Sequence, residues 1–243
     1  MRASRWMPVL LVILAVTGSG FAADLPPMKI EKYELPNGLD VILQEDHTIP
    51  NLTVNIWYHG GSKNEEKGRT GFAHLFEHMM FQGSKNHDKD YFMPFEKIGG
   101  DVNGSTTEDR TNYYESTPSN YLELSLWMEA DRLVNLLPAM TQEKLDNQRD
   151  VVKNERRQRV DNQPYGRVWE NLGWLMFPEE HPYNWPVIGY MEDLSSASME
   201  DVHRLIGARK RPAAMSVQRI RRSPFDLAAL ERATDAQEWR NVQ

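Results

Sequence analysis

The stretch from residue 31 to residue 45 constrains the fold of this chain most, because it predicts a β-hairpin. Apolar residues alternate on both sides of Pro36-Asn37-Gly38, and an Asn-Gly pair between two such runs is a strong hairpin signal. A third strand is predicted from Leu52 to His59, where apolar and polar residues again alternate until Gly60-Gly61. The body of the chain therefore begins with a sheet that needs a covering layer.

Helices are predicted to supply that layer. One runs from Phe72 to Gln82, with apolar residues at helical spacing, and stops at Gly83. A longer helix is predicted from Pro118 to Leu137, with Thr117 as its N-cap and Pro138 as its breaker, and Thr141 caps the next. Other segments are predicted to be a short helix at 92–98, extended chain at 101–115, and helices at 142–160, 167–176 and from 198 onward. The fold class is α+β, a two-layer sheet covered by helices.

Composition excludes some functions and restricts others. A formal net charge of −7 argues against nucleic-acid binding, which depends on lysine and arginine along a basic face. The chain has no cysteine, so any zinc must be held by histidine and carboxylate side chains. Stability must come from packing, and from a bound metal if there is one, because disulfides are not possible.

The N-terminal residues differ from the body of the chain. Arg2 and Arg5 precede an apolar run from Met7 to Val16, and small residues with Gly20-Phe21-Ala22 follow. This pattern predicts a signal peptide over residues 1–22 and export to the periplasm or beyond. The run is shorter than the roughly 20 residues that span a bilayer. No stable membrane span is therefore expected after cleavage, with an uncleaved anchor as the alternative.

The C-terminal residues differ as well. Residues 204–243 contain nine Lys or Arg against four Asp or Glu, although the whole chain is acidic. The arginines interrupt any apolar pattern. We interpret residues 30–205 as one domain and residues 206–243 as an atypical basic tail, frameshifted or disordered.

A metal site is predicted on the helix that begins at Phe72. The sequence there contains His-x-x-Glu-His, at His74, Glu77 and His78. At 100° per residue, Glu77 lies about 60° to one side of His74 and His78 about 40° to the other, so all three share one face. Two imidazoles at this spacing can bind one Zn²⁺, and Glu77 can take a proton from a water that the ion activates.

Two alternatives remain open from the motif alone. A helix can expose two histidines and a glutamate by chance, and a catalytic zinc needs a third protein ligand. A small-molecule lyase of the autoinducer-synthesis type also uses such a motif, but its chemistry calls on cysteine, which this chain lacks.

Three segments carry a family resemblance. G-R-T-G-F-A-H-L-F-E-H-M-M-F-Q-G-S is followed by G-G-D-V-N-G-S-T-T-E-D-R-T-N-Y-Y and by Q-R-D-V-V-K-N-E-R-R-Q-R. This series resembles the pitrilysin, insulysin and mitochondrial processing peptidase family of zinc metallopeptidases, over about residues 30–205. The resemblance implies a metallopeptidase half-domain of the processing-peptidase type, because family members continue into a second, related domain that closes over the substrate.

The resemblance also implies site residues. Glu155 would be the third zinc ligand, and Gln148 stands where many relatives carry a glutamate near the metal. Asn103 and Gly104 would lie on an edge strand that binds extended peptide by main-chain pairing, with a turn after Gly99-Gly100 as the alternative for Asn103.

The resemblance implies a zinc-dependent endopeptidase, with one Zn²⁺ per chain, that hydrolyses peptides or small proteins. The alternative is a catalytically inactive half-protein, or truncated remnant, that binds a partner subunit. A second peptidase-like subunit or domain is an expected partner in either case. Because the apolar strand expected after the helix at residue 198 is not recognised in the basic tail, the sheet is predicted to be incomplete.

Overall fold

A computed structural model describes residues 28–208 and 214–219. Six strands form one sheet in the order β1-β2-β6-β3-β5-β4, and every neighbouring pair is antiparallel except β2 with β6. The predicted hairpin is confirmed by the first two strands. The strands are β1 (Ile30–Glu34), β2 (Asp40–Glu45), β3 (Asn51–Tyr58), β4 (Asp101–Thr106), β5 (Thr111–Pro118) and β6 (Ala214–Arg219).

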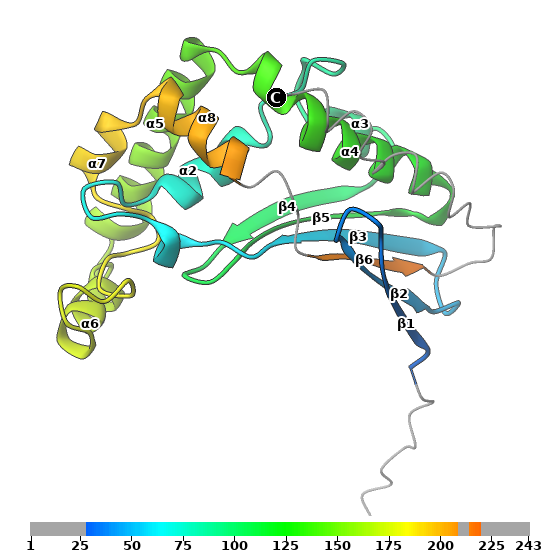
Figure 1. The fold of residues 1–243 in the computed structure, drawn as a ribbon, viewed down its shortest axis with the longest axis horizontal. Coiled ribbons are helices and arrows are strands. Elements are labelled where there is room, and N and C mark those ends of the chain that lie inside the picture. The colour runs from blue at the N-terminus through cyan, green and yellow to red at the C-terminus, as the bar shows by residue number, and fades with distance from the viewer. Residues whose placement is uncertain (1–27, 209–213, 220–243) are drawn as a thin grey trace, which may run out of the picture.

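The helices lie on one side of this sheet, except α6, which projects beyond the end of the sheet (Figure 1). They are α2 (Phe72–Met79), α3 (Met93–Glu96), α4 (Leu122–Ala139), α5 (Gln142–Arg156), α6 (Val168–Met176), α7 (Met191–Ser196) and α8 (Met199–Ala208). Short 3₁₀ turns at Ser62–Asn64 and Ser119–Tyr121 and a π-helical turn at Arg157–Asp161 complete the elements. The predicted α+β class is confirmed. No helix in the described ranges is both long and apolar enough to cross a membrane.

The core lies between the sheet and the helices that cover it. Alternate residues of β3 are buried, as the period-2 pattern predicts, and they belong to one cluster with buried residues of α2, α4 and α5. Each fully buried aliphatic or aromatic side chain contributes about 1.5–3 kcal/mol. The main members are Leu52, Val54, Ile56, Phe72, Leu75, Phe76 and Met79.

The predicted start of helix α4 is wrong by four residues. Pro118 ends strand β5 opposite Asn51, and Thr117 is a fully buried strand residue rather than an N-cap. Pairing with β3 holds this segment extended, which a proline at a strand end permits. The helix begins at Leu122 and continues through Pro138 to Ala139. Thr141 does cap α5, because its side chain accepts a hydrogen bond from the backbone of Lys144.

The predicted domain end at residue 205 is also wrong. Helix α8 extends to Ala208, and β6 lies between β2 and β3 in the sheet. Met215 pairs with Val41 and Ile56, and Val217 pairs with Leu43 and Val54. This short alternation is a strand signal that the surrounding arginines obscure, and the strand fills the place predicted to be empty. The predicted signal peptide and residues 220–243 lie outside the described residues.

Candidate metal centre

The N-terminus of helix α2 is capped by the side chain of Glu65, because its own N-cap residue is a glycine. Gly71 has φ 83° and offers no capping side chain. The Glu65 carboxylate accepts hydrogen bonds from the backbone N–H of Gly71 at 3.0 Å and of Ala73 at 2.6 Å. A carboxylate at this position satisfies orphan donors and complements the helix dipole. The start of the motif helix is thereby fixed.

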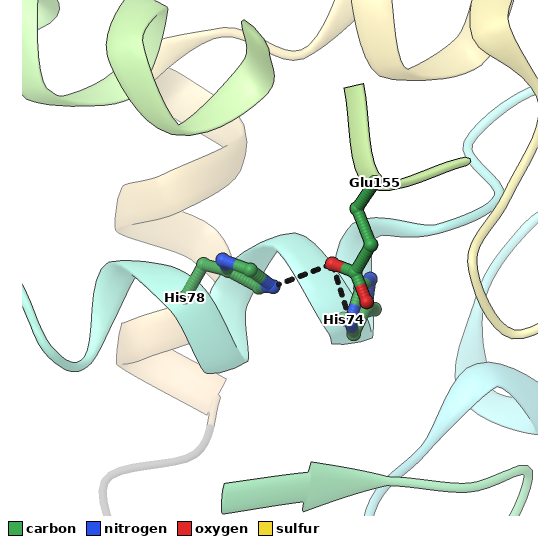
Figure 2. Close-up of side chains that lie close together, drawn as sticks. All are labelled: His74, His78 and Glu155. Carbon is green, nitrogen blue, oxygen red and sulfur yellow. Dashed lines mark ion pairs between the residues drawn. The ribbon is translucent and has the colours of Figure 1, made fainter. Parts of the chain in front are cut away.

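Three potential metal ligands converge between α2 and α5 (Figure 2). Nε2 of His78 lies 3.2 Å from Glu155 Oε2, and Nε2 of His74 lies 3.7 Å from the same oxygen. One ligand atom from each residue lies within 4.8 Å of the others. Tetrahedral zinc with ligands at about 2.0–2.2 Å separates neighbouring ligand atoms by about 3.3–3.6 Å. The distances from the two histidines to Glu155 Oε2 are close to this separation, so these three side chains could hold a single zinc ion.

The electrostatics of these groups favour their metal-binding forms. Burial, followed by the charge of His78, lowers the pKa of His74 to about 4, so its imidazole is neutral near pH 7. The hydrogen bond with His78 lowers the pKa of Glu155, so its carboxylate is ionised. The other oxygen of Glu155 pairs with Arg159 at 2.6 Å. Neutral imidazole and ionised carboxylate are the forms that bind a cation.

Glu77 points toward strand β4. Its Oε2 accepts a hydrogen bond from Thr106 Oγ1 at 2.5 Å. A Cβ on Gly104 would come within 3.2 Å of Glu77 Oε1, so the glycine leaves room for this carboxylate. Burial raises the pKa of Glu77 and the Thr106 hydrogen bond opposes that rise. A carboxyl group with a raised pKa beside a metal site suits general base chemistry.

A cleft of about 880 Å³ brings the predicted site residues together. Its wall on the sheet side is β4, which pairs only with β5 among the described strands and leaves its other edge open. Asn103 lies within this strand opposite Tyr114, so the alternative that it completes a turn is wrong. Residues that line the cleft include His74, Glu77, His78, Asn103, Gly104, Gln148 and Glu155.

Gln148 lies on α5 and is 6% exposed. Its neutral amide stands in the cleft seven residues before Glu155. Gln148 therefore adds no negative charge beside the candidate ligands, whereas a glutamate at this position would add one.

Sequence reasoning missed two residues of the site. Arg159 could have been found, because it follows Glu155 at i+4 and the two charges are opposite. Thr106 carried no local signal, since its contact with Glu77 depends on the packing of β4 against α2.

The chain is similar in sequence to known peptidases. The family described as Insulinase (Peptidase family M16) matches residues 40–181. Zinc protease PqqE of Helicobacter pylori is 32% identical over 195 residues, which are 79% of this chain and 43% of PqqE. Mitochondrial-processing peptidase subunit beta of Blastocladiella emersonii is 28% identical over 188 residues, 77% of this chain and 39% of that protein.

Solved structures agree. A protease from Helicobacter pylori has a TM-score of 0.75 at 28% identity, over 85% of this chain and 49% of that one. Pitrilysin has a TM-score of 0.73 at 21% identity, over 86% of this chain and 23% of that one, and shares the fold. The chain spans less than half the length of each of these relatives. The resemblance seen in the sequence is confirmed, since the matched family covers more than half of the residues: the chain belongs to the M16 insulinase family of peptidases.

Proposed function

We propose that this chain is the zinc-binding, catalytic half of an endopeptidase that hydrolyses peptides or small proteins. The observation that carries the proposal is the convergence of His74, His78 and Glu155 on one point, with Glu77 on the same helix facing the same cleft. The curated relatives named as zinc proteases support zinc as the ion.

Each residue has a separate task in this proposal. His74, His78 and Glu155 would hold the ion. Bound zinc polarises a peptide carbonyl and lowers the pKa of water, which peptide hydrolysis at neutral pH requires. Glu77 accepts the proton of the attacking water at its carboxylate and passes it to the leaving amine. Thr106 holds that carboxylate in place.

Substrate would bind along β4. An extended peptide can add to an open strand edge through main-chain hydrogen bonds, and Asn103 and Gly104 place that edge on the cleft. Because Gly104 has no side chain, the Glu77 carboxylate lies close to the strand backbone at this position. This arrangement favours unfolded peptides over folded proteins as substrates.

The second candidate is a half-protein that cleaves only with a partner, or that only binds one. The observation that favours it is length, because the chain spans 43% of PqqE and 49% of the solved Helicobacter pylori protease. We also propose export to the periplasm, on the strength of the N-terminal pattern. The related PqqL of Escherichia coli is described as a periplasmic protease.

Zinc content and peptide cleavage test both candidates. The purified chain should hold close to one zinc, and Glu77→Gln should hold as much, because glutamine removes the base and none of the ligands. Cleavage of a fluorogenic peptide library that disappears in Glu77→Gln supports the catalytic half. Zinc without cleavage supports the second candidate, and a folded chain without zinc refutes the site.

A further inference from the structure

A buried ion pair connects helix α5, which carries the candidate ligand Glu155, to helix α6. Nη1 of Arg156 lies 2.5 Å from Glu170 Oε1, and the two residues are 3% and 5% exposed. Charged residues are rarely buried to this extent. A buried ion pair contributes little to stability, because the loss of hydration offsets the attraction between the charges. The place of this pair beside a candidate metal ligand indicates a role other than stability.

Arg156 follows Glu155 directly at the end of α5. Successive residues of a helix point about 100° apart, so the Glu155 side chain faces the cleft while the Arg156 side chain is buried. After Arg156 the chain continues into the π-helical turn Arg157–Asp161. Helix ends fray, and π-helical turns occur often at functional sites. The backbone of α5 alone therefore does not hold Glu155 firmly.

The Arg156 guanidinium supplies further contacts at this point. The same Nη1 that donates to Glu170 also donates to the Gly189 carbonyl at 2.8 Å. Gly189 lies against the start of α2, because a Cβ on Gly71 would come within 2.8 Å of the Gly189 Cα. Asp161 is a more distant partner, at 3.7 Å from Nη2. Glu170 is thus the carboxylate that holds the guanidinium between α5, α6 and the helix of the two histidines.

We propose that Glu170 is a positioning residue for the metal site, because through Arg156 it fixes the last turn of α5 and hence the Glu155 carboxylate. Arginine suits this task, since its planar guanidinium donates in fixed directions. Glu155 approaches the two histidines from another helix, so a displacement of its turn changes the distances between the ligands. These distances are 3.2 Å and 3.7 Å, from Nε2 of His78 and of His74 to Glu155 Oε2. The proposal rests on the proposed function only for the presence of a metal.

A second buried ion pair provides a matched control. Arg132 and Glu129 are each 1% exposed, and Nε of Arg132 donates to Glu129 Oε2 at 2.9 Å. Both lie on α4, which carries none of the three candidate ligands. Shortening Glu129 therefore perturbs a buried pair of the same kind without displacing a ligand helix.

Two substitutions of Glu170 separate the reach of its side chain from its charge. Glu170→Asp keeps the charge but shortens the side chain by one carbon–carbon bond, about 1.5 Å, so Arg156 or α6 must shift to restore the contact. Glu170→Gln keeps the length and an acceptor oxygen but removes the charge. Zinc affinity, measured by chelator competition, should fall about tenfold in Glu170→Asp, the lower end of the range for residues that support metal ligands. It should fall less in Glu170→Gln.

The visible spectrum of the chain loaded with Co²⁺ gives a second readout. Cobalt accepts histidine and carboxylate ligands as zinc does, and its absorption depends on their geometry. The spectrum should change in Glu170→Asp. Glu129→Asp should lower the free energy of unfolding, measured with urea and circular dichroism, and should leave both the zinc affinity and the cobalt spectrum unchanged.

Several outcomes overturn the proposal. One is an unchanged zinc affinity in Glu170→Asp. A larger loss in Glu170→Gln would make the effect one of charge, and an equal loss in Glu129→Asp would make it one of general stability. If Glu170→Asp does not fold, Arg156→Lys decides, because an ammonium lacks the fixed directions of the guanidinium and zinc binding should weaken; an unchanged affinity there also overturns the proposal.

The same measurements separate this proposal from the proposed function. A folded, unmodified chain that binds no zinc refutes the metal site and this proposal with it. Zinc bound with equal affinity by the unmodified chain and by every Glu170 variant overturns only the role of Glu170.

Discussion

Replacing Glu115 with glutamine should not lower the free energy of unfolding appreciably at pH 7, although Glu115 is buried beside Arg132. Two carboxyl groups face this one guanidinium. Nε of Arg132 donates to Glu129 Oε2 at 2.9 Å and Nη2 contacts the other oxygen of Glu129, whereas Glu115 Oε1 is 3.4 Å from Nη2. Burial and the charge of Glu129 raise the pKa of Glu115 well above its usual value. We infer that Glu115 stays protonated and that Glu129, which contacts Arg132 with both oxygens, is the carboxyl group that pairs with the guanidinium.

The two glutamates should therefore respond differently to the same substitution. Glutamine has the shape of a protonated glutamic acid, so Glu115→Gln keeps the oxygen that accepts from Tyr91 at 3.3 Å and should cost less than about 1 kcal/mol. Glu129→Gln leaves the guanidinium buried without a counter-charge and should cost about 3–5 kcal/mol. Urea denaturation followed by circular dichroism at pH 7 measures both.

The difference should also depend on pH. The pKa of Glu115 is raised in the folded state, so its contribution to stability is fully present below the unfolded pKa of about 4.3 and is lost as pH rises through the folded pKa. Glu115→Gln has no such ionisation, so its stability relative to the unmodified chain should improve toward alkaline pH. Equal losses for Glu115→Gln and Glu129→Gln at pH 7 would refute the assignment of the proton.

Three further predictions concern the site. Thr106→Val removes a hydrogen bond that lowers the pKa of Glu77, so the acid limb of the cleavage profile, where Glu77 becomes protonated, should move to higher pH. Thr106→Ser should restore it, and an unmoved limb would contradict the role of Thr106. Glu155→Gln should weaken zinc binding by more than the about 10–100-fold typical of an outer-shell loss, measured by chelator competition; an unchanged affinity excludes Glu155 as a ligand. Glu65→Ala removes the acceptor for two N–H groups of α2 and should lower the unfolding free energy by about 1–2 kcal/mol, with the exposed Glu66→Ala as control; equal effects of the two would show that the cap contributes nothing.

Local sequence patterns predicted the elements for which tertiary packing favours the same structure as the local sequence does. The hairpin, strand β3 and the Thr141 cap follow from turn chemistry, alternation and capping preference, and the structure has all three. The start of α4 failed because Thr117 and Pro118 resemble a cap and a first turn, yet pairing of β5 with β3 holds them extended. Strand β6 failed because its partners are 157 to 174 residues away in sequence, and only those partners complete its pattern.

The residues of the candidate site also divide into those that local spacing predicts and those that depend on contacts between distant segments. His74, Glu77 and His78 share a helix, so their spacing alone places them on one face. Glu155 came from a family resemblance, because no local pattern connects two elements 77 positions apart. The contact of Thr106 with Glu77 depends on how β4 packs beside α2, which periodicity does not determine.

Contacts within the protein fix the position of α5, which carries Glu155, relative to α2, which carries His74 and His78. Arg156, the neighbour of Glu155 on α5, donates to the Gly189 carbonyl at 2.8 Å. Gly189 in turn lies against the start of α2. A Cβ added to Gly189 would come within 2.4 Å of the Cα of Gly71. This series of contacts connects the helix of Glu155 to the helix of His74 without a metal. Because packing and hydrogen bonds hold these candidate ligands together, a zinc ion bound there would enter a preorganised site.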